Sequence, residues 1–418
     1  MWSCNNSKTK KVTQEEEKVS ITAKDILGNP EYLAMSYGGY RYPDHSIEPT
    51  MDELKEDMKL LHALGIRIIR TYKLLKPQAA NLVKAISEMK KEDPNFEMYV
   101  MLGAWVDCKN SFGSGDGDPD HNIENEENPA EIERAVALAN KYPDIIKVIA
   151  VGNEAMVKWA ASYYVEPWII LKWVNHLQDL KKDGKLSKDL WITSSDNFAS
   201  WGGGGEEYHV EDLNNLIKAV DFLSVHTYPM HDTHYQPEFW LDQEGLEGKT
   251  DMEKIEISML RAKTYAIKQT EDVKKYMESL GVNKPIHIGE TGWASFSSGH
   301  YGPTGSKACD EYKEALYYQH MRDWTNEAKM SCFYFEGFDE PWKGGENSGN
   351  SEKHFGLFKV DGKAKYVLWD EVDKGTFKGL TRNGNAITKT YEGDKEVMMK
   401  DVEVPPTSEE WHASQNKH

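Results

Sequence analysis

The sequence has few cysteines, no long hydrophobic run and a deficit of positive charge. Its four cysteines show no CxxC spacing among 418 residues, which excludes a disulfide framework and a zinc ribbon. No stretch approaches the roughly 18 consecutive apolar residues of a membrane-spanning helix, and the mean hydropathy is −0.69. The net charge of −19 repels phosphate backbones, so nucleic acid is not an expected partner.

Aromatic residues, by contrast, are abundant. The chain holds 13 Trp, 21 Tyr and 12 Phe, and 39% of its residues are hydrophobic. This is enough apolar material for a large core, which excludes a wholly disordered chain. Trp and Tyr either pack such a core or form flat platforms for ring-shaped ligands, including sugars, and composition does not decide between the two.

The amino terminus resembles the start of a mature bacterial lipoprotein. Cys4 is followed by a polar stretch that runs through Glu17, as in a lipid-modified cysteine with a tether behind it. We therefore expect residues 1–25 to form a flexible tether and Cys4 to carry a membrane anchor, on a protein exported to the periplasm or the outer-membrane surface. The alternative is a chance cysteine in a disordered terminus.

Short apolar runs alternate with amphipathic helical patterns along most of the chain. Thr50 and Glu53 form a capping box before one helix, and further helical patterns cover residues 77–90, 129–142, 167–182 and 251–280. This alternation predicts an α/β fold, a (β/α)8 TIM barrel with long βα loops over residues 26–360. A doubly wound open sheet is the alternative, but no strand is followed by a GxGxxG turn. The predicted strands lie at residues 32–38, 66–71, 98–103, 145–151, 190–194, 222–226, 286–289 and 330–335.

Beyond residue 360 the pattern changes, because glycines divide a charged stretch into short pieces. We expect residues 361–418 to form a short C-terminal extension that packs on the barrel and frays near Pro405 and Pro406. The sequence thus predicts one catalytic barrel and no second domain, and we expect a monomer.

Polar or aromatic residues stand at the end of every predicted strand, where a TIM barrel carries its active site. Glu154 and Glu290 follow the fourth and seventh strands, so we expect them to face each other across the barrel mouth. Two such carboxylates suit glycoside hydrolysis, in which one donates a proton to the leaving oxygen and the other is ionised. Asn153 can donate to a sugar 2-hydroxyl. Two surface or salt-bridged glutamates are the alternative, which the neighbouring Gly, Asn and Trp disfavour.

The segments Gly152-Asn153-Glu154 and Gly289-Glu290-Thr291-Gly292-Trp293 resemble the two catalytic signatures of clan A retaining glycosidases. Together with residues 69–72 and 338–343, they resemble glycoside hydrolase family 17 from about residue 35 to 358. The resemblance implies a bacterial endo-β-1,3-glucanase, or laminarinase, that retains anomeric configuration and uses neither cofactor nor metal. Glu154 would be its acid/base and Glu290 its nucleophile.

The resemblance and the strand ends together predict the residues that bind the glucan. Glu336 and Lys343 match a supporting carboxylate and lysine of the family, and Glu340 is a further supporting candidate. We expect three tryptophans of the set, Trp105, Trp293 and Trp342, to be sugar platforms. The predicted substrate-binding residues are Tyr37, Arg70, Tyr72, Trp105, Asn153, Tyr228, Trp293, Glu336, Asp339, Glu340, Trp342 and Lys343.

Four other features allow weaker predictions. Residues 116–127 have the acid spacing of a calcium loop but lack its turn glycine, so we interpret them as a solvated acidic loop. The four glycines at 202–205 predict a flexible rim that closes over substrate. We interpret His226 as a hydrogen-bonded scaffold residue, and the histidines at 231 and 234 as without a metal.

Two other functions remain open on the sequence. A β-1,3-glucan transglycosylase would use the same residues, with a sugar in place of water resolving the glycosyl-enzyme. A non-catalytic glycan-binding lipoprotein is the second, and the presence of both Glu154 and Glu290 argues against it. The sequence also leaves open endo or exo action, the number of subsites and the tolerance of β-1,6 branches.

Overall fold

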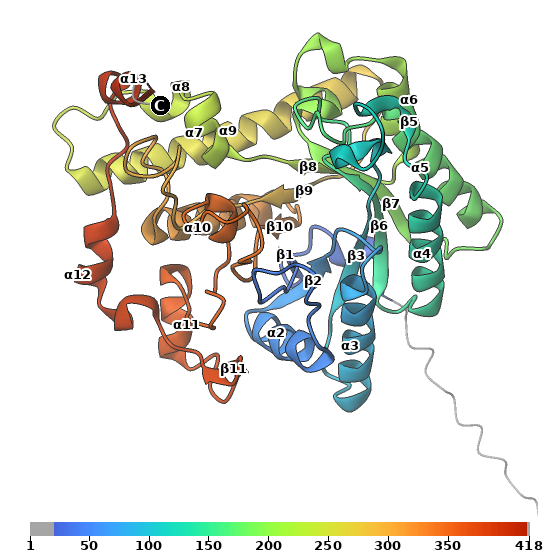
Figure 1. Ribbon diagram of the computed structural model, residues 1–418, viewed down its shortest axis with the longest axis horizontal. Helices are drawn as coiled ribbons and strands as arrows, with labels where there is room; N and C mark the ends of the chain where they lie inside the picture. Colours follow the sequence, from blue (N-terminus) through green and yellow to red (C-terminus); the bar gives the residue numbers. More distant parts are fainter. Residues whose placement is uncertain (1–20, 416–418) are drawn as a thin grey trace, which may run out of the picture.

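The computed structural model describes residues 21–415, which fold around a closed barrel of eight parallel strands (Figure 1). Neighbouring strands follow the order β1-β10-β9-β8-β7-β6-β3-β2. The predicted TIM barrel is confirmed, and each predicted apolar run overlaps one strand. The strands are β1 (Leu33–Ser36), β2 (Ile66–Arg70), β3 (Tyr99–Ala104), β6 (Ile146–Asn153), β7 (Trp191–Asn197), β8 (Leu223–His226), β9 (Ile286–Thr291) and β10 (Cys332–Tyr334).

Helices surround the barrel, and the sequence explains where they begin. The Thr50 hydroxyl accepts a hydrogen bond from the backbone of Glu53, whose carboxylate returns to Thr50, so the predicted capping box starts the second helix. Thr250 and Glu253 form a second capping box, at the start of α9 (Asp251–Ser279). The helices of the outer ring are α2 (Met51–Ala63), α3 (Gln78–Glu92), α4 (Asn128–Lys141), α5 (Pro167–Lys182), α6 (Glu211–Ala219), α9 (Asp251–Ser279) and α10 (Glu311–Glu327).

Alternate residues of several strands serve two apolar cores. On β3, Tyr99 and Met101 belong to the cluster inside the barrel, whereas Val100 and Leu102 pack in the larger cluster between strands and helices. This division follows from the two-residue period of a strand. The short helix α1 (Ala23–Ile26) buries its own apolar side chains in the inner cluster, so it closes the amino-terminal end of the barrel.

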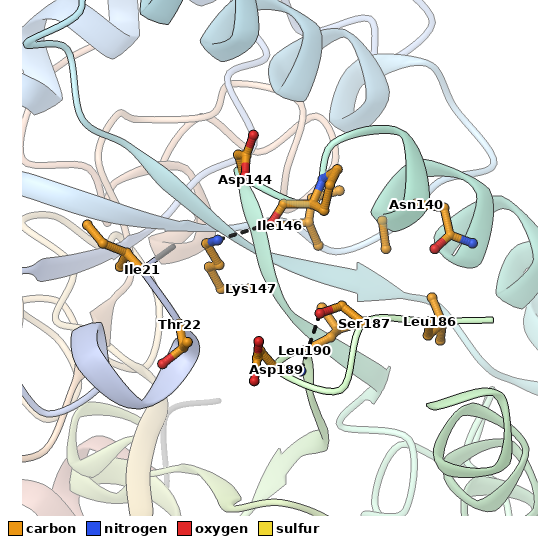
Figure 2. Close-up of a pocket in the computed structure, with 12 residues that line it drawn as sticks. Ile21, Thr22, Asn140, Asp144, Ile146, Lys147, Leu186, Ser187, Asp189 and Leu190 are labelled. Atoms are coloured by element: carbon orange, nitrogen blue, oxygen red, sulfur yellow. Dashed lines mark hydrogen bonds between the residues drawn. The ribbon is translucent and has the colours of Figure 1, made fainter. Parts of the chain in front are cut away.

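A small cavity of about 80 Å³ lies beside that closed end (Figure 2). Ile21 and Thr22 line it together with Lys147 of β6, whose ammonium donates a hydrogen bond to the Pro143 carbonyl oxygen at 3.0 Å. The barrel unit thus begins before the predicted boundary at residue 26. Cys4 and residues 1–20 of the expected tether lie outside the described residues.

The C-terminal extension is tied to the barrel by buried ion pairs. Arg382 Nε lies 3.0 Å from Asp57 Oδ1 of α2, and Lys365 Nζ lies 2.8 Å from Asp339 Oδ1. A last helix follows Pro405 and Pro406, and its Glu410 pairs with Lys307 at 3.8 Å. Figure 1 shows the extension in orange and red as α11 (Trp369–Lys374), β11 (Thr381–Arg382), β12 (Asn385–Ala386), α12 (Lys395–Met398) and α13 (Ser408–Gln415).

Two further findings concern the part of the chain between residues 21 and 415. None of its helices is both long and apolar enough to cross a membrane. Its cysteines, Cys108, Cys309 and Cys332, are free thiols, as the spacing predicts.

Candidate active site

Two cavities at the carboxyl ends of the strands meet at Glu290 and Phe335. The first, here called the Trp105 cavity, has a volume of about 520 Å³. The second, the Trp159 cavity, has a volume of about 950 Å³. The Trp105 cavity is lined among others by Tyr40, His45, Tyr72, Lys76, Trp105, Phe112, Asn153, Glu340, Trp342 and Lys343, and the Trp159 cavity by Glu154, Trp159, Asn197, Phe198, Tyr228, His231, Tyr235, Tyr265, Glu352 and Phe355.

Glu290, on β9, is held at both carboxylate oxygens. Tyr228 donates its hydroxyl to Oε1 at 2.7 Å, and Tyr72 donates its hydroxyl to Oε2 at 2.9 Å. The guanidinium of Arg70, on β2, also donates to Oε2. The side chain of Glu290 is 10% exposed. Residues from three strand ends, those of β2, β8 and β9, thus converge at one fixed carboxylate.

Opposing effects set the charge state of Glu290. Burial raises the pKa of a carboxyl group, but the charges of Arg70 and His226 and the hydrogen bonds from Tyr228 and Tyr72 outweigh it, and the pKa of Glu290 falls to about 2. The group is therefore ionised throughout the range in which enzymes ordinarily work. An ionised, desolvated carboxylate is the form that attacks an electrophilic carbon.

Glu154 follows the end of β6 in a strained backbone conformation. Its φ of 46° lies in the left-handed region, which side chains other than glycine rarely adopt at a cost on the order of 1–3 kcal/mol. Its backbone N–H donates to the Ser195 carbonyl at 3.0 Å, and the pairing of β6 with β7 shifts register at this point. The shift turns the Glu154 side chain into the Trp159 cavity, where it remains 25% exposed.

His226, at the end of β8, connects Glu154 to the barrel interior. Its Nδ1 lies 3.1 Å from Glu154 Oε1, and its Nε2 lies 2.8 Å from the hydroxyl oxygen of Ser195. The ring is fully buried. His226 is hydrogen-bonded, as the scaffold interpretation has it, and it also contacts one of the two candidate catalytic carboxylates.

Arg70 connects Glu290 to Asn153, the residue that directly precedes Glu154. One nitrogen of the Arg70 guanidinium donates to Glu290, and the other donates to Asn153 Oδ1. A further bond runs from Arg70 to the Gly289 carbonyl at 2.9 Å. Because Asn153 accepts through its oxygen, its amide nitrogen is the group left to donate into the Trp105 cavity.

Aromatic faces line the Trp105 cavity. Trp342 stacks on His45 with the ring centres 3.6 Å apart, and Trp105 packs against Tyr163 at 5.4 Å. The Trp105 indole nitrogen donates to Asp107 at 3.1 Å, which fixes the plane of the ring. Phe112, which is 60% exposed, extends this surface toward solvent. The cavity thus offers two held tryptophans, as a sugar-binding surface requires.

A group of charges forms the wall of the Trp105 cavity beside β10. Lys343 Nζ lies 3.0 Å from Glu336 Oε1 and 2.9 Å from Glu340 Oε2. Glu340 also accepts the backbone N–H of Tyr40 at 3.2 Å. Glu336 is buried, and burial raises the pKa of its carboxyl group even though Lys343 opposes the shift. Lys343 and Glu340 line the cavity, while Glu336 supports Lys343 from behind.

The structure places three predicted substrate contacts away from the cleft or behind it. Trp293 is fully buried against Trp240 and Tyr317, with its indole nitrogen donating to Ala308, so it is no sugar platform. The other two are Arg70, which is 1% exposed and holds Glu290 and Asn153, and Asp339, which is buried against Lys365. Tyr37 does line the Trp105 cavity, although it is 1% exposed and its hydroxyl donates to Asp57.

The weaker sequence predictions also change. The glycines at 202–205 serve close packing: Gly202 has a φ of 89°, and a Cβ there would lie 2.1 Å from the Tyr276 ring. Gly204 and Gly205 line the Trp159 cavity. In the acidic loop, Glu124 lies in β5 (Asp120–Glu124) and binds Lys172 and Trp173, so it does not converge with the other acids. No group of three or more His, Cys, Asp or Glu side chains within the described range is arranged to hold a metal ion.

Three further groups of the site were not predicted. Asp196, at the end of β7, accepts the Met156 N–H at 2.7 Å, and burial raises the pKa of its carboxyl group to about 6. His231 and Glu352 pair across the Trp159 cavity. Asp196 was visible as a strand-end acid, whereas His231 lies in the short helix after β8 and Glu352 in a helical turn after β10, and the sequence does not reveal that these two segments meet.

Comparisons with known proteins agree with this geometry. The family model of the BtgE/BtgC glycoside hydrolase domain matches residues 34–356. An endo-laminarinase structure from Formosa Hel1_33_131 is 66% identical, with a TM-score of 0.91 over 93% of this chain and 98% of that one.

Two fungal proteins are more distant. A glucan 1,3-beta-glucosidase of Arthroderma benhamiae is 24% identical over 85% of this chain and 95% of its own length. A glycoside hydrolase family 17 beta-1,3-glucanosyltransferase from Rhizomucor miehei has a TM-score of 0.52 at 18% identity, over 81% of this chain and 96% of that one, and shares the fold.

Proposed function

The chain belongs to the BtgE/BtgC glycoside hydrolase domain family, and from this premise we propose that it is a retaining endo-β-1,3-glucanase of glycoside hydrolase family 17 that acts on laminarin-type glucans. The observation that carries the proposal is the pair of carboxylates in unlike environments, Glu290 buried and ionised and Glu154 partly exposed beside His226. The Formosa endo-laminarinase, at 66% identity, supports the substrate and the endo action.

The first chemical step forms a covalent bond between Glu290 and the anomeric carbon of the sugar. A carboxylate oxygen of Glu290 attacks the anomeric carbon while the bond from that carbon to the glycosidic oxygen breaks, and the carboxylic acid of Glu154 gives its proton to the departing oxygen. Arg70, Tyr72 and Tyr228 hold Glu290 in position for attack. The Asn153 amide donates to the sugar 2-hydroxyl, a contact that strengthens in the transition state.

The second step regenerates the enzyme. The carboxylate of Glu154 takes a proton from water, the water oxygen attacks the anomeric carbon, and the bond to Glu290 breaks with its electron pair returning to the carboxylate. Two inversions leave the anomeric configuration unchanged. The strained backbone and partial exposure of Glu154 suit this double role, since the group must both release and recover a proton.

Attachment through Cys4 remains part of our proposal for the cell. A lipid-modified cysteine would hold the barrel at a membrane surface, where an exported glucanase meets its polysaccharide. Labelling the cells with an alkynyl fatty acid tests it: the expected label disappears in Cys4→Ser, and equal labelling of both proteins contradicts the anchor.

Product analysis on linear β-1,3-glucan tests the catalytic proposal. We expect early release of a ladder of laminari-oligosaccharides, with proton NMR showing the β-anomer first. A mixed-linkage glucan serves as control for linkage, and Glu290→Gln as control for a contaminating activity. Release of glucose alone would contradict endo action, an α-anomer appearing first would contradict retention, and no release would contradict the function.

A further inference from the structure

We propose that the Trp159 cavity binds the leaving-group side of the glucan, with Trp159 and Tyr235 as sugar platforms and the His231–Glu352 pair as its polar contact. A second sugar chain bound there competes with water for the glycosyl-enzyme, so this site sets the balance between hydrolysis and transglycosylation. The inference rests on the proposed function and adds the direction in which the substrate lies.

The two catalytic carboxylates define the direction. Glu290 lines both cavities, Asn153 lines the Trp105 cavity, and Glu154 lines the Trp159 cavity. The sugar attacked by Glu290 must present its 2-hydroxyl to Asn153, whereas the oxygen that leaves must lie beside Glu154. The retained part of the chain therefore occupies the Trp105 cavity, and the departing part occupies the Trp159 cavity.

Trp159 is a large apolar surface that the fold leaves bare. Its side chain is 62% exposed, although it stands in a turn that the Ala160 N–H closes by donating to the Val157 carbonyl at 3.0 Å. The neighbouring Lys158 is held through its backbone and its side chain. Its N–H donates to the Tyr208 hydroxyl at 3.1 Å, and its ammonium donates to the Glu207 carbonyl at 3.0 Å. Because Trp159 lines a cavity that holds other aromatic rings, it forms part of an apolar surface of the kind that marks a ligand-binding groove.

Tyr235 supplies a second bare ring from another element. It ends α7 (Pro229–Tyr235), and it too is 62% exposed and lines the Trp159 cavity. Trp159 comes from the loop after β6 and Tyr235 from the helix after β8, so the two rings approach the cavity from different strands. Tyrosine combines an apolar face with a hydroxyl, as an amphipathic sugar ring requires.

His231 and Glu352 add charge to the same cavity. His231 Nε2 lies 3.5 Å from Glu352 Oε1, and the two side chains are 32% and 42% exposed. Burial lowers the pKa of His231, but Glu352, Glu154 and Asp232 raise it further than burial lowers it. The pair thus presents both a donor and an acceptor to sugar hydroxyls.

The His231 ring also touches the machinery around the nucleophile. It stacks on Tyr228 with the ring centres 5.0 Å apart and the planes at 21°, and Tyr228 donates to Glu290. A sugar that engages His231 therefore lies next to the glycosyl-enzyme bond. When its 3-hydroxyl attacks the anomeric carbon, Glu154 takes the hydroxyl proton, the bond to Glu290 breaks, and a new β-1,3 bond replaces the one lost.

Trp159→Ala tests the inference against Trp168→Ala, which removes a 38% exposed tryptophan at the start of α5. Each variant is assayed on laminarihexaose and on an aryl β-laminaribioside, whose small leaving group does not reach Trp159. We expect the ratio of kcat/KM for hexaose to that for the aryl substrate to fall about tenfold in Trp159→Ala and to stay unchanged in Trp168→Ala.

The product mixture gives a second readout. At high laminarihexaose concentration, products longer than the substrate should decline relative to hydrolysis products in Trp159→Ala, and also in Glu352→Gln, which keeps the shape but removes the charge. The inference is overturned if Trp159→Ala and Glu352→Gln both match the control Trp168→Ala, in the ratio of kcat/KM for hexaose to that for the aryl substrate and in the share of long products. The proposed function fails separately, if the unaltered protein releases no sugar from linear β-1,3-glucan.

Discussion

Glu290 and Glu154 belong to one active site, yet the fold treats them in opposite ways. Glu290 is 10% exposed and held by Arg70, Tyr72 and Tyr228, whereas Glu154 is 25% exposed and has one side-chain contact, to His226. The nucleophile needs a fixed position and a permanent charge, which contacts supply. The acid/base must exchange a proton with solvent in every cycle, which close confinement would prevent.

Loss of the nucleophile should have the largest effect. We expect Glu290→Gly to lower kcat on β-1,3-glucan by at least on the order of 10⁴-fold, because no covalent intermediate can form. Azide should restore turnover of an aryl β-laminaribioside and yield the α-glycosyl azide, since it attacks the β-linked substrate directly. A β-azide would show that Glu290 is not the nucleophile.

The matching change at Glu154 should cost less and give the opposite stereochemistry. We expect Glu154→Gly to lose about 10²- to 10⁴-fold on glucan, the usual contribution of a general acid. An activated aryl leaving group needs no proton, so the first step should survive on that substrate. Azide should then yield the β-glycosyl azide, by attack on the α-linked glycosyl-enzyme. Equal losses on glucan and aryl substrates would contradict the assignment.

Arg70 is the charge that makes the surroundings of Glu290 differ from those of Glu154. Its removal in Arg70→Leu should raise the pKa of Glu290 from about 2, because the positive charge favours the ionised carboxylate. Activity should then be lost at a higher pH on the acid side, with kcat down about 10²-fold at neutral pH. The control Arg70→Lys keeps the charge, so its acid limb should move less.

The same pair of groups allows a check on stability. Glu290 has a lower pKa folded than unfolded, so its ionisation stabilises the protein above its ordinary pKa of 4.5, and this contribution disappears as pH falls toward 2. Thermal melts of Arg70→Leu and the unaltered protein should therefore differ most above pH 5 and converge in acid. Parallel curves would contradict the coupling.

The contact to His226 should matter least. We expect His226→Phe, which keeps the ring shape but removes its hydrogen bonds to Glu154 and Ser195, to lower kcat about tenfold. The loss should be smaller for an activated aryl substrate, whose first step does not use the acid. A loss as large as that in Arg70→Leu would mean that the two carboxylates are held to the same degree.

The fold was largely predictable because each barrel strand carries its own pattern. The helix at residues 167–182 has the predicted bounds, and the capping box at Thr50 starts α2 where expected. Glu154 and Glu290 were predictable as strand-end residues. Strand-end position does not give the environment of a side chain, however: Trp293 is buried in the core, and Arg70 lies behind Glu290 and Asn153, although both stand at strand ends.

Register shifts between strands contribute to the difference between the predicted and the observed directions of strand-end side chains. The pairing of β6 with β7 shifts before Asn153, and the pairing of β8 with β9 shifts before His226. Such irregularities turn side chains by local amounts that the two-residue period does not predict. His231 and Glu352 were missed because their contact depends on two short helical segments that lie far apart in the sequence.

Composition and local periodicity are properties of the chain, so the scarcity of cysteine, the absence of a long apolar run, the barrel and the two candidate catalytic carboxylates could be read without the structure. Tertiary packing selected which aromatic rings face the cleft and which fill the core. It also decided that Glu290 is buried beside Arg70 while Glu154 stays in contact with solvent. Burial and charge proximity arise from groups distant in sequence, so they exist only once the barrel has closed.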